Sequence, residues 1–350
     1  MESSLACNLA CVMCPWKDVR KTAAHGGLMT AGIWEALRPH LPQVESIDLS
    51  GGGEPLLNPS LLAWLVQAKK AGCAAGFLTS GQLLDEKKAA GLAEAGADWV
   101  GFSLDGATRE VYEQIRKGAG FDRLLQNVKR LASLRKDGPP KIILQCVMMP
   151  ENMGQLGGMV ELAADIGADQ INFKQCDVIR ESTPRGLSLF AGEQLGRLKE
   201  RQRLLDKALA RARGLGIKTT AFSFAPDELP ACDMDPSGSL FVAYDGRVGP
   251  CINHAYGGAT SFLGQEAKMP EVCYGRLPQQ DLLDIWERSE ECLFFRRRFA
   301  QRVQAYNQAL KRADLDEPSL YKLNRALDQA KKAMPPAPAG CDVCHYLYDV

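Results

Sequence analysis

Residues 94–105, EAGADWVGFSLD, decide the fold because they join a helical segment to a buried strand. The helical stretch ends at Gly96, a residue that can take the left-handed conformation closing many helices without a Cβ clash. The apolar run that follows lacks the polar alternation of a half-exposed strand. It therefore indicates a strand that is covered on both faces, as in a parallel sheet.

The same junction recurs along the first two thirds of the chain, with Gly72, Gly138, Gly167 and Gly216 in the place of Gly96. Amphipathic segments such as 121–135 lie between the apolar runs. Strand and helix in alternation predict five or six parallel strands with right-handed crossovers before residue 222. We expect an α/β fold that forms a partial (β/α)6 TIM-like barrel, with a doubly wound open sheet as the alternative.

Composition excludes several classes of protein. The 350 residues carry 42 Lys and Arg against 42 Asp and Glu, so the net charge is zero. Broad nucleic-acid binding needs an excess of clustered cations, which is absent here. No apolar run is long enough to span a membrane, and MESSLACNLACVMCP lacks the basic flank of a secretory signal. We therefore expect a cytoplasmic protein whose 12 cysteines are not paired in structural disulfides.

The pattern changes near residue 225. A segment rich in Pro, Asp and Gly reads as a linker, and Asp245-Gly246 between two β runs predicts a hairpin. Helices are expected over 282–299, 300–313 and 318–334. We predict a barrel domain over residues 1–225 and a small α+β domain over residues 226–350, held together in part by what its cysteines bind.

Three cysteines near the start give the sharpest signal in the chain. Cys7, Cys11 and Cys14, in the pattern C-x3-C-x2-C, can point from one short loop at a single centre. Cys thiolates hold iron–sulfur clusters, and three ligands to a four-iron cluster leave one iron open for chemistry. Structural zinc would require a fourth Cys or His nearby. His25 is the next such residue, and it is not at zinc-finger spacing.

With this cysteine motif placed after a strand at the opening of a barrel, the chain resembles the radical S-adenosylmethionine (radical SAM) superfamily over essentially its whole length. The resemblance implies a [4Fe–4S] cluster whose open iron binds S-adenosylmethionine. One electron then cleaves this cofactor to a 5′-deoxyadenosyl radical, which abstracts hydrogen from a substrate. It also implies an electron donor of the flavodoxin or ferredoxin type. The protein's part is to bind, orient and exclude water.

The resemblance extends to residues that would bind S-adenosylmethionine. Gly52, Gly53 and Glu54 match the family's GGE motif after the second strand of the barrel, where Glu54 would accept from the ammonium group. Ser103, at the end of the fourth strand, and Arg116 match residues that bind the carboxylate; a solvated helix-end cation is the plain alternative for Arg116. The full set of cofactor-binding residues that we expect is Gly52, Gly53, Glu54, Ser80, Ser103, Asp105 and Arg116. Thr79-Ser80-Gly81 departs from the usual Thr-Asn-Gly, which leaves the role of Ser80 open.

A second constellation comprises Cys232, Cys251, Cys341 and Cys344. It resembles the auxiliary-cluster domain of the SPASM/Twitch subgroup. Because no cysteine follows Cys344, the shorter Twitch form with one auxiliary [4Fe–4S] cluster fits best. Cys273 or Cys292 could replace Cys232, and structural zinc is the alternative metal.

Substrate-side residues are expected at the end of the strand before residue 176, where barrel sites lie. We name Lys174, Cys176 and Asp177 as the catalytic candidates; ordinary solvation of a strand end is the alternative. The resemblance implies net oxidation of a substrate C–H bond, with the auxiliary cluster as acceptor of the second electron. Radical epimerisation, with a cysteine returning hydrogen, and peptide maturation are the alternatives, and a zinc-stabilised binding protein is the non-enzymatic one. The substrate is therefore expected to be a small molecule or a peptide.

Overall fold

The computed structural model describes residues 1–135, 138–176, 180, 183–312 and 319–350. Its centre is a six-stranded parallel sheet in the order β1-β2-β3-β4-β5-β6, which confirms the predicted partial barrel. The strands are β1 (Ser46–Asp48), β2 (Ala74–Thr79), β3 (Trp99–Ser103), β4 (Lys141–Met148), β5 (Gln170–Gln175) and β6 (Lys218–Ala221). Strands adjacent in sequence are neighbours throughout, so the order never reverses as it would in a doubly wound sheet.

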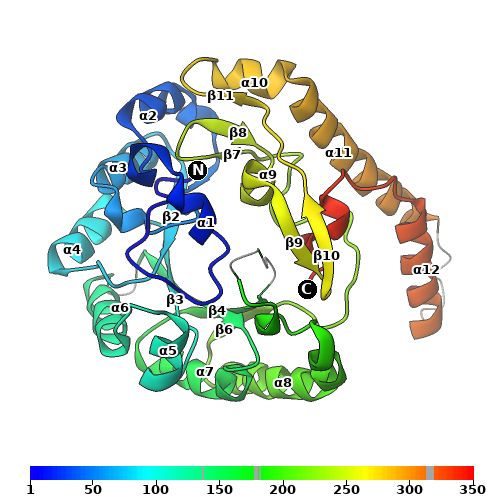
Figure 1. The fold of residues 1–350 in the computed structure, drawn as a ribbon, viewed down its shortest axis with the longest axis horizontal. Coiled ribbons are helices and arrows are strands. Elements are labelled where there is room, and N and C mark those ends of the chain that lie inside the picture. Colours follow the sequence, from blue (N-terminus) through cyan, green and yellow to red (C-terminus); the bar gives the residue numbers. More distant parts are fainter. Residues whose placement is uncertain (136–137, 177–179, 181–182, 313–318) are drawn as a thin grey trace.

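The helices between β1 and β6 connect the strands and lie along the outside of the sheet, and two further helices precede β1 (Figure 1). They are α1 (Lys17–Lys21), α2 (Ala31–Leu37), α3 (Leu61–Lys70), α4 (Glu86–Ala95), α5 (Arg109–Ile115), α6 (Phe121–Arg135), α7 (Leu156–Asp165) and α8 (Leu198–Gly214). Buried residues of helix and strand form one continuous core that includes Phe77, Phe102, Leu124 and Phe173.

The glycine junctions behave as predicted at four of five positions. Gly72, Gly96, Gly167 and Gly216 have φ values of 93°, 71°, 76° and 72°. Gly138 is not among the glycines with positive φ. The reason lies in the next residue, because a residue that precedes proline is driven toward extended conformations.

The expected strand before the cysteine loop is wrong. Residues 1–6 make only an isolated antiparallel bridge between Ser4 and Leu28, and the sheet begins at Ser46. The strand before the Gly52-Gly53-Glu54 motif and the strand that ends at Ser103 were expected to be the second and fourth, and they are β1 and β3. The short N-terminal segment instead lies on the loop after β1, where the amide of Glu54 donates to the carbonyl of Ala6 at 2.7 Å.

The C-terminal part is built from short strands and long helices. Its elements are β7 (Phe241–Val242), β8 (Arg247–Gly249), α9 (Ile252–Tyr256), β9 (Gly258–Phe262), β10 (Gln265–Met269), β11 (Gly275–Arg276), α10 (Leu282–Arg288), α11 (Glu290–Lys311) and α12 (Leu320–Ala333). Asp245-Gly246 does join the antiparallel pair β7 and β8. The helix boundary expected at residue 299 is wrong, because α11 runs through it. The break falls at Ser289, whose side chain caps α11 by accepting from the amide of Cys292.

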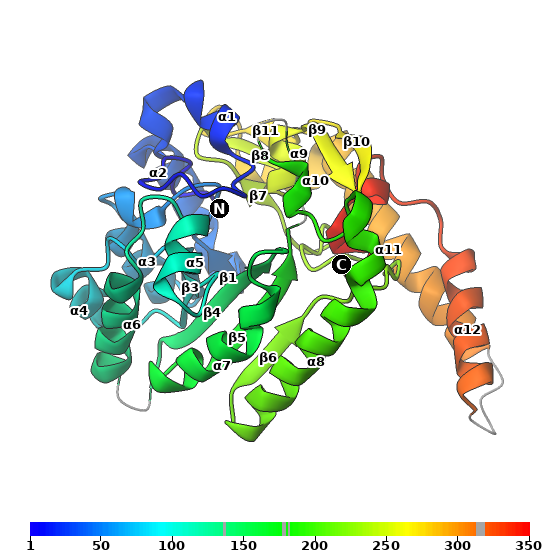
Figure 2. The same cartoon turned by 60° about the horizontal axis from the view of Figure 1, so that its bottom comes forward.

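Figures 1 and 2 show the C-terminal elements filling the side of the molecule between the two ends of the barrel arc, with α11 and α12 along the outer edge. Backbone hydrogen bonds fix this arrangement. Ser223 donates to Asp349 at 2.9 Å, and Glu2 donates to Val242 at 2.7 Å. Among the helices that the structure describes, none has both the length and the apolar character needed to cross a lipid bilayer.

Arg302 joins the predicted linker to helix α11, and it is 1% exposed. Its guanidinium forms an ion pair with Glu228 at 2.7 Å and donates to the carbonyls of Leu229, Pro230 and Pro335 at 2.7–3.2 Å. These contacts hold the segment that leads to Cys232 against the segment that leads to Cys341.

We expect Arg302→Ala to lower the free energy of unfolding by about 3 kcal/mol, because three carbonyls lose a charged donor and Glu228 loses its ion-pair partner. Urea denaturation of the purified protein measures the change. Arg297→Ala is the matched control on the exposed face of the same helix and should change stability by less than about 0.5 kcal/mol. Equal effects of the two substitutions would contradict this role.

Candidate active site and auxiliary cysteine site

The three N-terminal cysteines lie on one loop at the carboxyl end of the sheet. Backbone amides of Ala10 and Val12 donate to the carbonyls of Lys117 and Ile115 at 3.0 and 2.9 Å, which ties the loop to the end of α5. Cys14 donates its amide to Cys11 at 3.2 Å, so the chain turns between these two ligands. All three cysteines pack against one small apolar cluster, with Leu9, Met13, Ile115, Met149, Cys176 and Leu187.

Two arginines bring positive charge to these sulfurs. Arg20 Nη2 lies 3.2 Å from Cys14 Sγ, and the same guanidinium donates to the carbonyls of Leu5 and Gly52. Arg116 Nη1 lies 3.8 Å from Cys11 Sγ. Burial raises the pKa of the Cys11 thiol, and the Arg116 charge opposes that shift. Nothing in the cysteine spacing predicted Arg20, since its only sequence signal is a basic residue six positions after Cys14.

This donor set fits a four-iron cluster. Three thiols face one apolar space and two guanidinium groups offset the negative charge that cluster-bound thiolates carry. Within the described part of the chain, no three His, Cys, Asp or Glu side chains are close enough together to hold one metal ion. A four-iron cluster does not need such closeness, because each thiolate binds a different iron.

Glu54 lies under this loop and is 1% exposed. Its carboxylate accepts from the Thr79 hydroxyl at 2.6 Å, from both the amide and the hydroxyl of Ser80 at 2.7 Å, and from the amide of Leu56 at 3.1 Å. The resemblance placed Gly53 among the residues that would bind S-adenosylmethionine. In the structure a Cβ there would come 2.2 Å from the carbonyl oxygen of Ala6, so this glycine admits the start of the cysteine loop.

Asp105 and Arg116 form a buried ion pair beside Cys11. Arg116 Nε donates to Asp105 Oδ2 at 2.6 Å, and their side chains are 11% and 0% exposed. The other carboxylate oxygen of Asp105 accepts from the amide of Val147 at 2.8 Å. Arg116 is therefore not the solvated helix-end cation that was the plain alternative. Ser103, at the end of β3, is also buried, at 6% exposure.

The predicted substrate-side residues separate in space. Cys176 is 4% exposed and packs in the apolar cluster with Cys11. Lys174 instead donates from Nζ to the hydroxyl of Tyr346 at 2.6 Å, two residues beyond Cys344. It therefore faces the C-terminal cysteines. Asp177 lies outside the residues that the structure describes.

The structure brings Cys232, Cys251, Cys341 and Cys344 together from three distant segments. Burial raises the pKa of the Cys341 thiol, and the nearby charges of Cys251, Cys344 and Cys232 raise it further. Of the other two C-terminal cysteines, Cys273 is exposed and donates to the carbonyl of Gly275 at 3.2 Å. The remaining one, Cys292, is buried and donates to the carbonyl of Trp286 at 3.7 Å.

Polar side chains on α9 contact these sulfurs, and sequence reasoning missed them. His254 Nδ1 donates to the carbonyl of Pro270 at 3.0 Å, and its Nε2 lies 3.4 Å from Cys341 Sγ. Burial lowers the pKa of His254, which favours the neutral ring. Asn253 Nδ2 lies 3.9 Å from Cys344 Sγ. The available signal was their place directly after Cys251 on a short helix.

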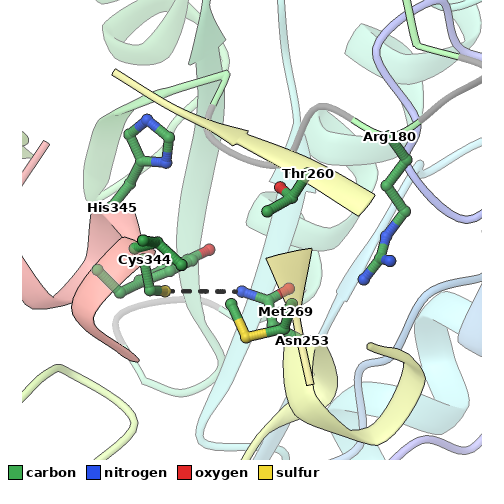
Figure 3. Close-up of a pocket in the computed structure, with 8 residues that line it drawn as sticks. Arg180, Asn253, Thr260, Met269, Cys344 and His345 are labelled. Atoms are coloured by element: carbon green, nitrogen blue, oxygen red, sulfur yellow. Dashed lines mark hydrogen bonds between the residues drawn. The ribbon is translucent and has the colours of Figure 1, made fainter. Parts of the chain in front are cut away.

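A small pocket lies beside Cys344 (Figure 3). The residues that line it are Arg180, Asn253, Thr260, Met269, Val343, Cys344, His345 and Tyr346. The guanidinium of Arg180 stacks at 4.9 Å on the ring of Trp16, two residues after Cys14, and donates to the carbonyl of Gly257. Burial lowers the pKa of Arg180, and no acidic partner for it occurs among the described residues. Arg180 therefore contacts both Trp16, next to the N-terminal cysteine loop, and the pocket beside Cys344.

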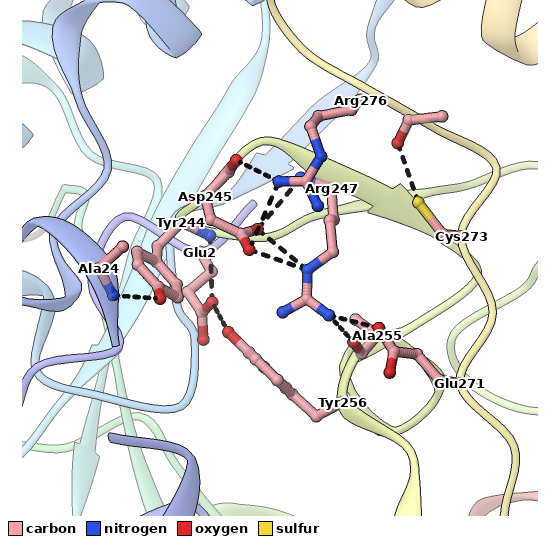
Figure 4. A network of polar contacts seen from close by, with 11 residues as sticks. Glu2, Ala24, Tyr244, Asp245, Arg247, Ala255, Tyr256, Glu271, Cys273 and Arg276 are labelled. Carbon is pink, nitrogen blue, oxygen red and sulfur yellow. Dashed lines mark hydrogen bonds and ion pairs between the residues drawn. The ribbon is translucent and has the colours of Figure 1, made fainter. Parts of the chain in front are cut away.

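Glu2 makes a second connection between these parts (Figure 4). Its buried carboxylate accepts from the amide of Gly52 at 2.8 Å, the amide of Tyr244 at 3.1 Å and the hydroxyl of Tyr256. Tyr256 in turn packs on Trp16, with 5.3 Å between the ring centroids. Burial raises the pKa of Glu2, against the effect of these donors. The glycine loop after β1 is thereby fixed to the C-terminal elements.

Comparison with known proteins agrees with this geometry. Residues 1–163 match the model of the radical SAM superfamily, and residues 232–309 match that of SPASM, an iron–sulfur cluster-binding domain. The chain therefore has a radical SAM domain followed by a SPASM domain, and it is a radical SAM enzyme. Its cofactors are S-adenosylmethionine and a [4Fe–4S] cluster in the first domain, and the second domain provides auxiliary iron–sulfur cluster binding. This replaces the alternative of a zinc-stabilised binding protein.

Two curated relatives cover most of the chain. A tungsten-containing aldehyde ferredoxin oxidoreductase cofactor-modifying protein from Pyrococcus furiosus is 26% identical over 307 residues, 85% of this chain and 82% of that protein. A PqqA peptide cyclase from Ruegeria pomeroyi is 28% identical over 296 residues, 81% of this chain and 72% of that protein.

Solved structures support the fold. SuiB from Streptococcus suis, bound to S-adenosylmethionine, aligns with a TM-score of 0.62 at 16% identity over 84% of this chain, which spans 66% of SuiB. The protein anSMEcpe with bound AdoMet aligns with a TM-score of 0.59 at 17% identity over 95% of each chain.

Proposed function

We propose that the chain oxidises a C–H bond of a peptide substrate held between the N-terminal cysteine loop and a single auxiliary [4Fe–4S] cluster. The contacts of Arg180 carry this proposal, because Arg180 lines the pocket beside Cys344 and its guanidinium stacks on Trp16 of the N-terminal loop. The name of the PqqA peptide cyclase supports a peptide over a small molecule.

We assign Cys7, Cys11 and Cys14 to the cluster that binds S-adenosylmethionine. The cofactor's amino and carboxylate groups would lie over Gly52, Gly53, Glu54, Ser80, Ser103, Asp105 and Arg116. Glu54 and Asp105 already bond to protein donors. Their part is therefore to hold Ser80 and Arg116 in position. When bound, the cluster and S-adenosylmethionine supply hydrogen abstraction from substrate; an electron donor of flavodoxin or ferredoxin type would support it.

One auxiliary cluster, as in the Twitch form, would be held by Cys232, Cys251, Cys341 and Cys344. The convergence of these four thiols supports this set over one that includes Cys273 or Cys292. Lys174 and Tyr346 would orient the substrate on the auxiliary side, and Cys176 would border it on the other. Asp177 stays a catalytic candidate, and it lies outside the described residues. The barrel domain would end near residue 225.

The test is a reaction under anaerobic conditions with the reconstituted full chain, a strong reductant, S-adenosylmethionine and short peptides encoded beside its gene. We expect 5′-deoxyadenosine together with a peptide that has lost two hydrogens, measured by mass spectrometry. A peptide that stays unmodified while a small molecule is oxidised would reject the substrate class. Formation of 5′-deoxyadenosine without any oxidised product would reject the proposed reaction.

Epimerisation is the second candidate function, and the position of Cys176 favours it. This thiol lies in the apolar cluster beside Cys11, where it could return hydrogen to a substrate radical. The same reaction in deuterated buffer separates the two functions. Epimerisation places solvent deuterium on carbon without change in oxidation state, whereas oxidation removes two hydrogens.

A further inference from the structure

Tyr274 has a buried hydroxyl without a hydrogen-bond partner among the described residues. The residue is 5% exposed and lies between Cys273 and strand β11. Its amide donates to the carbonyl of Val248 at 2.7 Å, and its ring packs on Phe295 with 5.9 Å between centroids. Backbone and ring are thus fixed, and the hydroxyl cannot turn toward solvent. An unpaired buried hydroxyl costs about 1–3 kcal/mol, so a native structure that keeps one calls for an explanation.

Ring contacts place Tyr274 near the auxiliary set. Phe295, on which Tyr274 packs, also packs on His254 with 5.4 Å between centroids, and His254 Nε2 lies 3.4 Å from Cys341 Sγ. The pKa of Tyr274 is raised by burial first, and then by the charges of Cys292, Cys251 and Cys341. Cys292 already donates to the carbonyl of Trp286 within its own segment, and we do not count it among the four proposed cluster ligands. Cys251 and Cys341 are two of the four proposed ligands. A thiolate or sulfide at this place would accept a hydrogen bond from the phenol.

The other polar groups around the set already have contacts. His254 is near Cys341 and is anchored on Pro270, and Asn253 is near Cys344. Among the described residues Tyr274 keeps a buried hydroxyl without a partner, and cluster sulfur would supply an acceptor for it. Hydrogen bonds to cluster sulfurs stabilise the more negative, reduced state and so raise the reduction potential.

We propose that Tyr274 donates a hydrogen bond to the auxiliary cluster and sets its reduction potential. It is a positioning residue, because it acts through the cluster rather than on the substrate. The inference rests on the proposed assignment of Cys251 and Cys341 as ligands, and it goes beyond that assignment. Its functional consequence is that the auxiliary cluster becomes a better acceptor of the electron released in substrate oxidation.

The experiment is a redox titration of the reduced auxiliary cluster, followed by electron paramagnetic resonance. It uses the full chain with Cys7, Cys11 and Cys14 replaced by alanine, so that only the auxiliary signal remains. We expect Tyr274→Phe to shift the one-electron reduction equilibrium about tenfold toward the oxidised cluster, which corresponds to a fall of about 59 mV. Tyr244→Phe is the control: it is equally buried, but its hydroxyl accepts from the amide of Ala24 at 3.1 Å.

A potential in Tyr274→Phe equal to that of Tyr244→Phe would overturn the inference. Should Tyr274→Phe fail to take up iron, 3-fluorotyrosine at position 274 decides instead. Its hydroxyl is a stronger donor in the same place, so the potential should rise, and an unchanged potential would also overturn the inference. Absence of auxiliary iron before any change at Tyr274 would instead reject the ligand assignment, which keeps the two failures distinct.

Discussion

A chain with Cys7, Cys11 and Cys14 all replaced by alanine should form no detectable 5′-deoxyadenosine and should retain about half of its iron. The three thiols lie in one apolar cluster with Arg20 and Arg116 at their sulfurs, and they offer the N-terminal cluster its protein ligands. Two [4Fe–4S] clusters hold about eight irons per chain, and one holds about four. Anaerobic iron and sulfide assays with chromatographic detection of 5′-deoxyadenosine measure both effects.

Cys73→Ala provides the matched control for this variant. Cys73 is buried in the core, just before β2, and its thiol donates to the carbonyl of Leu41 at 3.2 Å. This substitution should leave iron content and cofactor cleavage unchanged. Cleavage that persists in the triple variant would refute the assignment of the N-terminal loop.

Replacing Cys251 and Cys341 together by alanine should abolish substrate oxidation but not cofactor cleavage. Iron should again fall to about four per chain, while 5′-deoxyadenosine is still formed on reduction. Oxidised product should fall by at least about 100-fold, since loss of cluster ligation removes the proposed acceptor of the second electron. The physical basis is the convergence of the four C-terminal thiols beside the pocket that contains Cys344.

Cys273→Ser controls for the loss of a cysteine from the same domain. Its thiol is exposed and bonds only locally to Gly275, so iron content and product should be retained. If Cys273→Ser removed the auxiliary iron and the double variant kept it, the ligand set would have to include Cys273. Product formation at the normal rate in the double variant would instead show that the auxiliary cluster has no part in the oxidation.

Contacts between the two cysteine sites suggest why the SPASM elements and the barrel form one structure. Glu2 bonds both the glycine loop after β1 and the C-terminal Tyr244 and Tyr256. Trp16 packs between Tyr256 and the guanidinium of Arg180. The distance between the two centres is thereby fixed by packed rings and buried hydrogen bonds rather than by a flexible linker.

Local patterns in the sequence were sufficient for the strands of the parallel sheet, most helices and the cysteine motifs. Glycine after a helix and an apolar run after the glycine are features of adjacent residues, which is why β2, β3, β5 and β6 could be predicted. Two exceptions have local causes as well. The proline after Gly138 disfavours the expected left-handed conformation, and a serine cap at 289 places a helix start that periodicity did not locate.

By itself the sequence determined the parallel α/β sheet and the C-x3-C-x2-C loop, because both depend on residues within a few positions of one another. Only the tertiary structure decided which side chains surround the sulfurs. Glu2 meets Tyr256 across 254 positions, and Arg116 meets Cys11 across 105. Tyr274, His254 and Arg302 likewise act through contacts that close only on folding. The periodicity of helices and strands cannot predict such pairs, because hydrogen bonds between distant segments depend on which parts of the chain the fold brings together.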